Sequence, residues 1–382
     1  MNDFSQQIFA FTATSSINSY ANFIALSQLA LTSREHTAAL IEELGLAQVT
    51  QSNDWFNIFC QLEQQIPTIT TQVIMAKNWQ VNKSLLTQLH QYFPVTFVER
   101  EIDPTSDLWR LSITNDWLAE IQLTVIGQDH IYYQTTDSVE AEIAKAIIVS
   151  GEIATASNEV GEYIRIPDDN SKIVINIIMP TFEQYSSVKK NLIGTLNSFK
   201  QLEQNTLEQI LIPYFANNIE SDDFVNIANL ISHNNVDDIF ADEGQNYSAI
   251  NSIENFILLL TSDTNNFTFD ETGKIKAQSS TEFFYEAIAF KEEAFQPTHS
   301  SSVTWTSNNF FPDLLIIDLC NEKLIAQDQY WRPYFIVIED ANTNLIYTIT
   351  ESKIPVIEDQ SNLCPEDIVL IEDIVLIEVS ND

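Results

Sequence analysis

The sequence predicts an α+β fold. Helical periodicity appears within the first 45 residues and again between Asn82 and Pro94. β-branched runs separated by turn residues become frequent from residue 162 onward. Because strands and helices do not alternate regularly, this order argues against a parallel α/β fold.

Individual elements follow from local patterns. Ser33 can cap a helix that ends at Gly45, and Asn82 opens a stretch in which Leu85 and Leu89 share one face before Pro94 ends it. Hairpins are expected at 162–180, with its turn at Asp168–Ser171, and at 332–350, with its turn at Ala341–Asn344. The remaining expected elements are helices at 181–205 and 222–231, extended segments at 210–215 and 256–271, and a long polar loop at 288–309.

Charge and composition narrow the classes of function. The chain has 382 residues, with 54 acidic against 17 basic side chains and a net charge of −37. Its 45% hydrophobic and 11% aromatic content nevertheless indicates a folded core. The charge argues against nucleic-acid binding and against anionic membrane surfaces. With seven glycines and no glycine-rich phosphate motif, nucleotide binding is not expected either.

The cysteines and the N-terminus bear on location. Cys60, Cys320 and Cys364 are far apart and odd in number, which fits a reducing compartment. No basic cluster precedes an apolar run at the N-terminus, so no signal peptide is expected. We therefore expect a cytoplasmic protein, or one exported or injected without a cleaved leader.

Motifs for catalysis or metal binding were not found. H-E-x-x-H, C-x-x-C and G-x-S-x-G are absent, and the five histidines have no ligand spacing. Acidic residues are too numerous for a catalytic pair to be singled out. The sequence therefore predicts no cofactor, no metal and no enzymatic activity.

The C-terminal tail, residues 356–382, differs from the rest of the chain. It carries eight acids and no base, and Glu366–Ile371 repeats immediately as Glu372–Ile377. Its β-branched content favours a strand. Such a strand could pair with a sheet edge, or the tail could serve as a segment that a partner or an export system recognises.

Collinear motifs give the chain a resemblance to the serpins. The closest stretch is 332–355, in which Arg332 and Pro333 open a strand, an Asn/Thr turn follows, and Pro355 closes a second strand. The other matching stretches are REHTAALIEEL (34–44), ITNDWL (113–118, similar to a helix of the family), IVINIIMP (173–180), ILIPYF (210–215), VDDIF with SAI (236–250), and FTFDETGKIKAQSST (267–281).

This resemblance implies an architecture. Serpins have three β-sheets, about eight helices and an exposed reactive-centre loop. The implied division is a serpin-like domain at 1–355, which contains an extended loop region at 273–330, followed by the acidic tail at 356–382. Residues 118–160 depart from the family, because they are short and lack its Asn-Ala strand of the central sheet.

The resemblance also implies a mechanism, in which a protease cleaves the loop and the loop inserts into the central sheet. Glu271 and Gly273 match the hinge of that loop. Counting from Gly273 turns Lys274 and Lys276 inward, together with Gln278, Ser280 and Glu282, and buried ammonium groups would oppose insertion. A shift of one residue would instead turn Ile275, Ala277, Ser279, Thr281 and Phe283 inward. The scissile bond would be Ala287–Ile288.

We therefore expect a serpin-like, non-enzymatic protein that binds another protein through its loop and acidic surface, without inhibitory insertion. One alternative is a working inhibitor of serine or cysteine proteases that is cleaved at Ala287–Ile288. A second is an acidic effector, such as a bacterial one, that engages a basic partner. Oligomeric state is left open.

Overall fold

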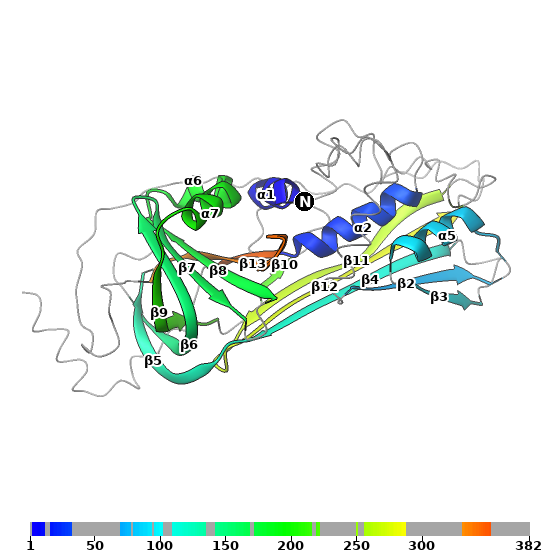
Figure 1. Cartoon of the computed structure of the whole chain (residues 1–382). Coiled ribbons are helices and arrows are strands. Elements are labelled where there is room, and N and C mark those ends of the chain that lie inside the picture. The colour runs from blue at the N-terminus through cyan, green and yellow to red at the C-terminus, as the bar shows by residue number, and fades with distance from the viewer. Residues whose placement is uncertain are drawn as a thin grey trace, which may run out of the picture.

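The computed structural model describes the chain in twelve segments separated by gaps. It describes residues 2–11, 16–32, 69–77, 79–93, 95–101, 109–134, 142–168, 172–215, 219–221, 250, 256–287 and 331–352. Within these ranges, helices and strands form two sheets with helices packed on them (Figure 1). The α+β class expected from the sequence is confirmed.

The first sheet, called the central sheet below, is long and six-stranded in the described part of the chain. Its strands β2 and β3 are parallel, and its other neighbours are antiparallel. The order is β10 (Ile219–Ser221), β11 (Phe256–Phe269), β12 (Lys274–Ala287), β4 (Trp109–Gln122), β2 (Ile69–Ala76), β3 (Val95–Arg100).

The second sheet has eight strands in the described residues, and β9 branches from β6. Every position of its strands β13 and β14 is buried. The order is β1 (Ser16–Ile17), β14 (Ile346–Ser352), β13 (Tyr334–Asp340), β8 (Ile173–Pro180), β7 (Gly161–Pro167), β6 (Glu142–Asn158), β5 (Val125–Tyr133), with β9 (Asn205–Pro213) beside β6.

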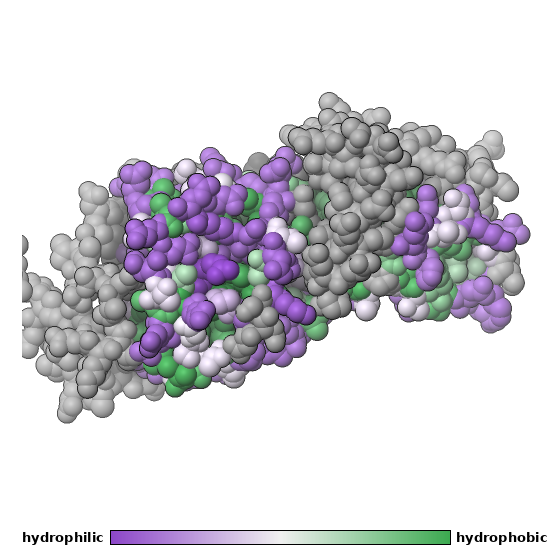
Figure 2. All heavy atoms as spheres, viewed as in Figure 1, coloured by the Kyte–Doolittle hydropathy of each residue, from purple (hydrophilic) through white to green (hydrophobic). Residues whose placement is uncertain are grey.

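Helices pack on both sheets. The described helices are α1 (Asn2–Phe11), α2 (Ser19–Thr32), α5 (Lys83–Tyr92), α6 (Tyr185–Lys190) and α7 (Leu192–Lys200). α1, α6 and α7 lie together on the second sheet, and α2 runs along the central sheet (Figure 1). Hydrophilic residues dominate the surface over α6 and α7 (Figure 2), because α7 turns Leu192, Leu196 and Phe199 inward.

Two buried ion pairs attach these helices to the sheet. Lys189 of α6 pairs with Glu351 of β14 at 2.7 Å, and Lys200 of α7 pairs with Glu339 of β13 at 2.7 Å. Both carboxylate side chains are almost fully buried, at 4% and 3% exposure. Tyr185 adds a hydrogen bond to Glu351. The two lysines thus supply the cations that these buried carboxylates need, although basic residues are scarce in this chain.

Elements with strong local signals are confirmed. Both hairpins form, as β7–β8 and β13–β14. α5 begins after Asn82, whose side chain accepts a hydrogen bond from the Ser84 amide, and ends at Phe93. β9 and β11 cover most of the two expected extended segments, and α6 and α7 occupy the helical segment after 181. The expected helices at 33–44 and 222–231, the polar loop at 288–309 and the tail at 356–382 lie outside the described residues.

One expected helix is wrong. Residues 113–118 lie inside strand β4, which pairs with β2 on one side and β12 on the other. Ile113, Asn115 and Trp117 are buried, whereas Asp116 and Leu118 are exposed, which is the period of a strand. β4 is instead a strand of the central sheet.

Candidate functional site

Residues 274–287 form a strand in the middle of the central sheet. β12 pairs antiparallel with β11, from Ile275 opposite Phe269 to Ala287 opposite Phe256. Its other edge pairs antiparallel with β4, beginning with Lys274 opposite Gln122. The expectation that this part of the 273–330 loop stays outside the sheet is therefore wrong for 274–287.

The register explains why the strand fits. The side chains that face the interior are all apolar, small or hydroxyl-bearing, and the charged ones point outward. The buried residues are Ile275, Ala277, Ser279, Thr281, Phe283 and Tyr285. Because a shift of one residue exchanges the two faces of a strand, the register counted from Gly273 is wrong and the shifted register is the one observed.

The outward face of β12 forms polar pairs with β4. Lys274 Nζ lies 3.1 Å from Glu120 Oε1. Ser280 Oγ donates to Asp116 Oδ1 at 2.7 Å. Glu282 Oε1 accepts hydrogen bonds from the hydroxyls of Ser112, at 3.2 Å, and Thr114, at 3.4 Å. Lys274 and Glu282, which the other register would have turned inward, thus have partners on β4.

A tight turn leads from β11 into β12. Asp270 Oδ1 accepts hydrogen bonds from the Thr272 amide, the Thr272 hydroxyl and the Lys274 amide, at 2.9, 2.6 and 3.0 Å. Partial burial acts to raise the pKa of Asp270, but these hydrogen bonds outweigh it and lower the pKa below its ordinary value. Asp270 therefore accepts the hydrogen bonds of the turn as a charged carboxylate.

Gly273 closes the turn against the start of β5. Its φ is +78°, and a Cβ at this position would lie 2.4 Å from Val125 Cγ2. Its carbonyl accepts a hydrogen bond from the Leu123 amide at 3.0 Å. Gln122 donates to the Thr272 carbonyl at 2.7 Å and Gln128 to the Glu271 carbonyl at 3.3 Å. Glycine is required here by both backbone conformation and space.

The structure separates the predicted site residues into two groups. Glu271, Gly273, Lys274, Lys276 and Ala277 lie together in the turn and the first part of β12. Ala287 ends the strand at the opposite end of the sheet, opposite Phe256, and Ile288 lies outside the described residues.

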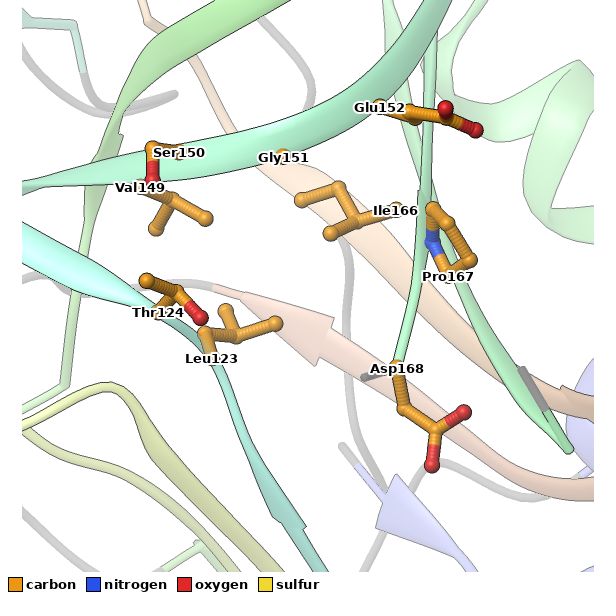
Figure 3. A pocket seen from close by; sticks show the side chains of 9 residues that line it. All are labelled: Leu123, Thr124, Val149, Ser150, Gly151, Glu152, Ile166, Pro167 and Asp168. Atoms are coloured by element: carbon orange, nitrogen blue, oxygen red, sulfur yellow. The ribbon is translucent and has the colours of Figure 1, made fainter. Parts of the chain in front are cut away.

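A small cavity lies beside the segment on which the turn docks. Its volume is about 180 Å³. Leu123 and Thr124 form one wall, and the others come from β6 and the end of β7 (Figure 3). The lining residues are Leu123, Thr124, Val149, Ser150, Gly151, Glu152, Ile166, Pro167 and Asp168. Two carboxylates and no base line it.

Polar side chains of the segment 16–32 contact the central sheet from inside, which sequence reasoning missed. Asn18 Nδ2 donates to the Gln278 carbonyl at 2.8 Å and to Asn265 Oδ1 at 3.0 Å. Near the other end of α2, the Thr32 and Tyr285 hydroxyls lie 2.7 Å apart. The available signal was that a segment with no charge carries several amides and hydroxyls.

A second set of these contacts forms a closed ring. Gln28 Nε2 donates to Thr71 Oγ1 at 3.0 Å, Thr71 Oγ1 donates to Asn115 Oδ1 at 2.7 Å, and Asn115 Nδ2 donates to Gln28 Oε1. All three side chains are buried, at 0–3% exposure. The ring joins α2 to β4, which pairs with β12, and to β2, the next strand of the central sheet.

No group of three or more His, Cys, Asp or Glu side chains in the described residues could hold a metal ion. None of the helices in the described ranges has the length and apolar character to cross a membrane.

Comparison with known proteins defines the class. No protein-family model and no curated protein matches the sequence. Among solved structures, cleaved Serpin 42Da is similar at 11% identity and TM-score 0.66, covering 93% of this chain and 97% of that chain. Tengpin, a thermophilic serpin in the latent state, is similar at 15% identity and TM-score 0.64, covering 93% and 96%. Ovalbumin from emu (Dromaius novaehollandiae) is similar at 11% identity and TM-score 0.59, covering 92% and 97%.

These likenesses cover nearly the whole of each chain, so the protein has the serpin fold. Its sequence is divergent from each of them. Within that fold, the strand that carries the loop resemblance is β12.

Proposed function

We propose that this chain is a protease inhibitor of the serpin type, in which residues 274–287 are the inserting strand. The observation that carries the proposal is the position of β12, paired on both edges, with its interior face free of charge. The sequence expectation of a non-inhibitory protein depended on Lys274 and Lys276 facing inward, and both face outward. Two of the similar solved structures are described as cleaved and as latent.

The energy for inhibition would come from adding β12 to the sheet. Burying a large apolar side chain such as Ile275 or Phe283 stabilises the chain by about 1.5–3 kcal/mol. Tyr285 also gains the buried contact with Thr32. A form of the chain with 274–287 outside the sheet lacks these contributions, so insertion releases free energy that can act on a bound protease.

The substrate class is a serine or cysteine protease. Its nucleophile would attack the Ala287 carbonyl, break the bond to Ile288, and remain attached to Ala287 as an acyl-enzyme while the new amino terminus leaves. The strand from Lys274 to Ala287 has 14 residues. At about 3.3 Å per residue, it would carry the attached protease roughly 46 Å from the turn.

A second candidate is a protein that binds without inhibiting. The observation that favours it is that β12 lies in the sheet of an uncut chain. Residues 288–330, a stretch of 43 residues between Ala287 and Trp331, can extend up to about 140 Å. Insertion then needs no cleavage, and a chain that has already inserted has no such energy left for a protease.

Incubation with a panel of serine and cysteine proteases separates the two candidates. An inhibitor forms a complex with the protease that survives detergent, whereas the second candidate stays intact or is cut without forming one. Thr281→Arg, on the interior face, should abolish the complex and leave a substrate. Ser280→Arg, on the outward face one residue away, is the matched control and should retain the complex. Cleavage of the wild-type chain at 274–330 without a complex contradicts inhibition.

A further inference from the structure

Buried polar atoms without partners lie on α2 and on β12, two elements that contact each other. In the described part of the chain, both polar atoms of the Asn22 side chain lack a hydrogen-bond partner, and so do Ser279 Oγ and Thr281 Oγ1. All three side chains are 0–1% exposed. Buried polar groups are nearly always hydrogen-bonded, because leaving one unpaired costs about 1–3 kcal/mol. Three unpaired side chains on two facing elements therefore need an explanation.

Two contacts fix how α2 lies along β12. Asn18 contacts the Gln278 carbonyl and Thr32 contacts Tyr285, so the helix and the strand run in the same direction. The 14 residue steps from Asn18 to Thr32 rise about 21 Å in a helix. The seven steps from Gln278 to Tyr285 rise about 23 Å in a strand. The helical segment and the strand segment are therefore of similar length, and about two residues of the helix correspond to each residue of the strand.

This relation places Asn22 next to the unpaired hydroxyls. The Asn22 amide donates to the carbonyl of Asn18, the residue before α2, at 3.1 Å, so Asn22 lies one helical turn beyond Asn18. Its rise of about 6 Å beyond Asn18 corresponds to roughly two strand residues beyond Gln278. This rise brings Asn22 to the level of Ser280, whose neighbours Ser279 and Thr281 are both buried on the interior face of β12. At this level, an amide with two donors and an acceptor and two hydroxyls that can both donate and accept are all buried without a partner.

We propose that Asn22, Ser279 and Thr281 form a buried latch, closed by ordered water, that holds β12 against α2. The three side chains do not contact one another directly at hydrogen-bond distance. A bridging water molecule satisfies such groups when two to four polar partners surround it. The latch is complete only when residues 274–287 occupy the sheet, because β12 supplies the two hydroxyls. The latch stabilises the inserted state whether or not the chain inhibits a protease.

The latch predicts coupled, not additive, effects. Removing one member leaves the others buried and unpaired, whereas replacing all of them by apolar groups of similar shape removes the need for partners. Asn22→Leu alone and the pair Ser279→Ala with Thr281→Val should each raise the amide exchange rate of residues 274–287 by roughly tenfold. The triple variant should return toward the wild-type rate.

The experiment is hydrogen exchange on the uncut chain without protease, so its outcome does not depend on inhibition. Ser280→Ala is the matched control: its hydroxyl bonds Asp116 on the outward face, and its effect should add to that of Asn22→Leu. If Asn22→Leu does not fold, Thr281→Val alone, which keeps the side-chain shape, should still raise exchange. Additive effects among the latch residues would overturn the latch. A high-resolution structure with no ordered water between α2 and β12 would overturn its water.

Discussion

Lys274 and Glu120 form an ion pair across β12 and β4, with Nζ and Oε1 3.1 Å apart on the outward face of the central sheet. Lys274 and Lys276 both lie on this face, so neither ammonium group is buried by insertion of the strand. Both partners of the pair are more than 40% exposed, so its contribution to stability is small. The pair agrees with the observed register, in which the side chain of Lys274 lies on the outward face of β12.

The register predicts opposite outcomes for two adjacent substitutions. Ala277→Lys places an ammonium group at a position with 0% exposure, and we expect a loss of about 3–5 kcal/mol or expulsion of the strand. Lys276→Ala, on the outward face, should change the free energy of unfolding by less than about 1 kcal/mol. Chemical denaturation of both variants measures this. Equal effects at the two positions would contradict the register.

Gly273 predicts a second pair of variants. Gly273→Ala should destabilise the chain by about 1–3 kcal/mol, because alanine disfavours a φ of +78° and its Cβ would meet Val125. Adding Val125→Ala removes the steric part and leaves the conformational part. Melting temperatures of the single and double variants separate the two contributions. A double variant no more stable than Gly273→Ala would show that the contact with Val125 is unimportant.

Asp270 predicts a dependence on pH. Its pKa in the folded chain is lowered below the ordinary 3.8, so the carboxylate stabilises the fold above that pH. This contribution is lost as the pH falls through the folded pKa. Asp270→Asn should therefore reduce stability at pH 7, and the difference from wild type should shrink in acid. Thr272→Val, which removes one donor to the carboxylate, should give a smaller effect of the same sign. Denaturation midpoints from pH 7 down to pH 2 test both, and a difference that grows in acid would contradict this role.

The ion pair between Lys200 and Glu339 predicts a compensating double variant. Lys200→Met leaves the Glu339 carboxylate, 3% exposed, without its cation, at a cost of about 3–5 kcal/mol. Adding Glu339→Gln removes the buried charge, so the double variant should recover part of the loss. Calorimetry on the four chains of this cycle gives the coupling. Lys77→Met is the control, since its pair with Glu101 is exposed and should cost little.

Local signals account for the elements that the sequence predicted correctly. The hairpin at β13–β14 needs only two apolar runs and a turn, in which Asp340 accepts the amides of Asn342 and Thr343. α5 needs only a capping Asn82 and an apolar stripe. The prediction for β4 was wrong for the opposite reason. The strand conformation of Ile113, Asn115 and Trp117 depends on the neighbouring strands that pair with β4 on both edges. Pairing with β12, more than 150 residues away, lies outside any local window.

By itself, the sequence determined the α+β class, the two hairpins, the capped helix α5 and the collinear motifs of the serpin fold, because each depends on residues close together in the chain. Tertiary structure decided which face of residues 274–287 is buried, since a strand can present either face until its two neighbours fix the register. It also brought the uncharged segment 16–32 against β12, where Asn18 donates to the Gln278 carbonyl and the Thr32 hydroxyl contacts that of Tyr285. That juxtaposition exists only when β11, β12 and β4 lie side by side over α2.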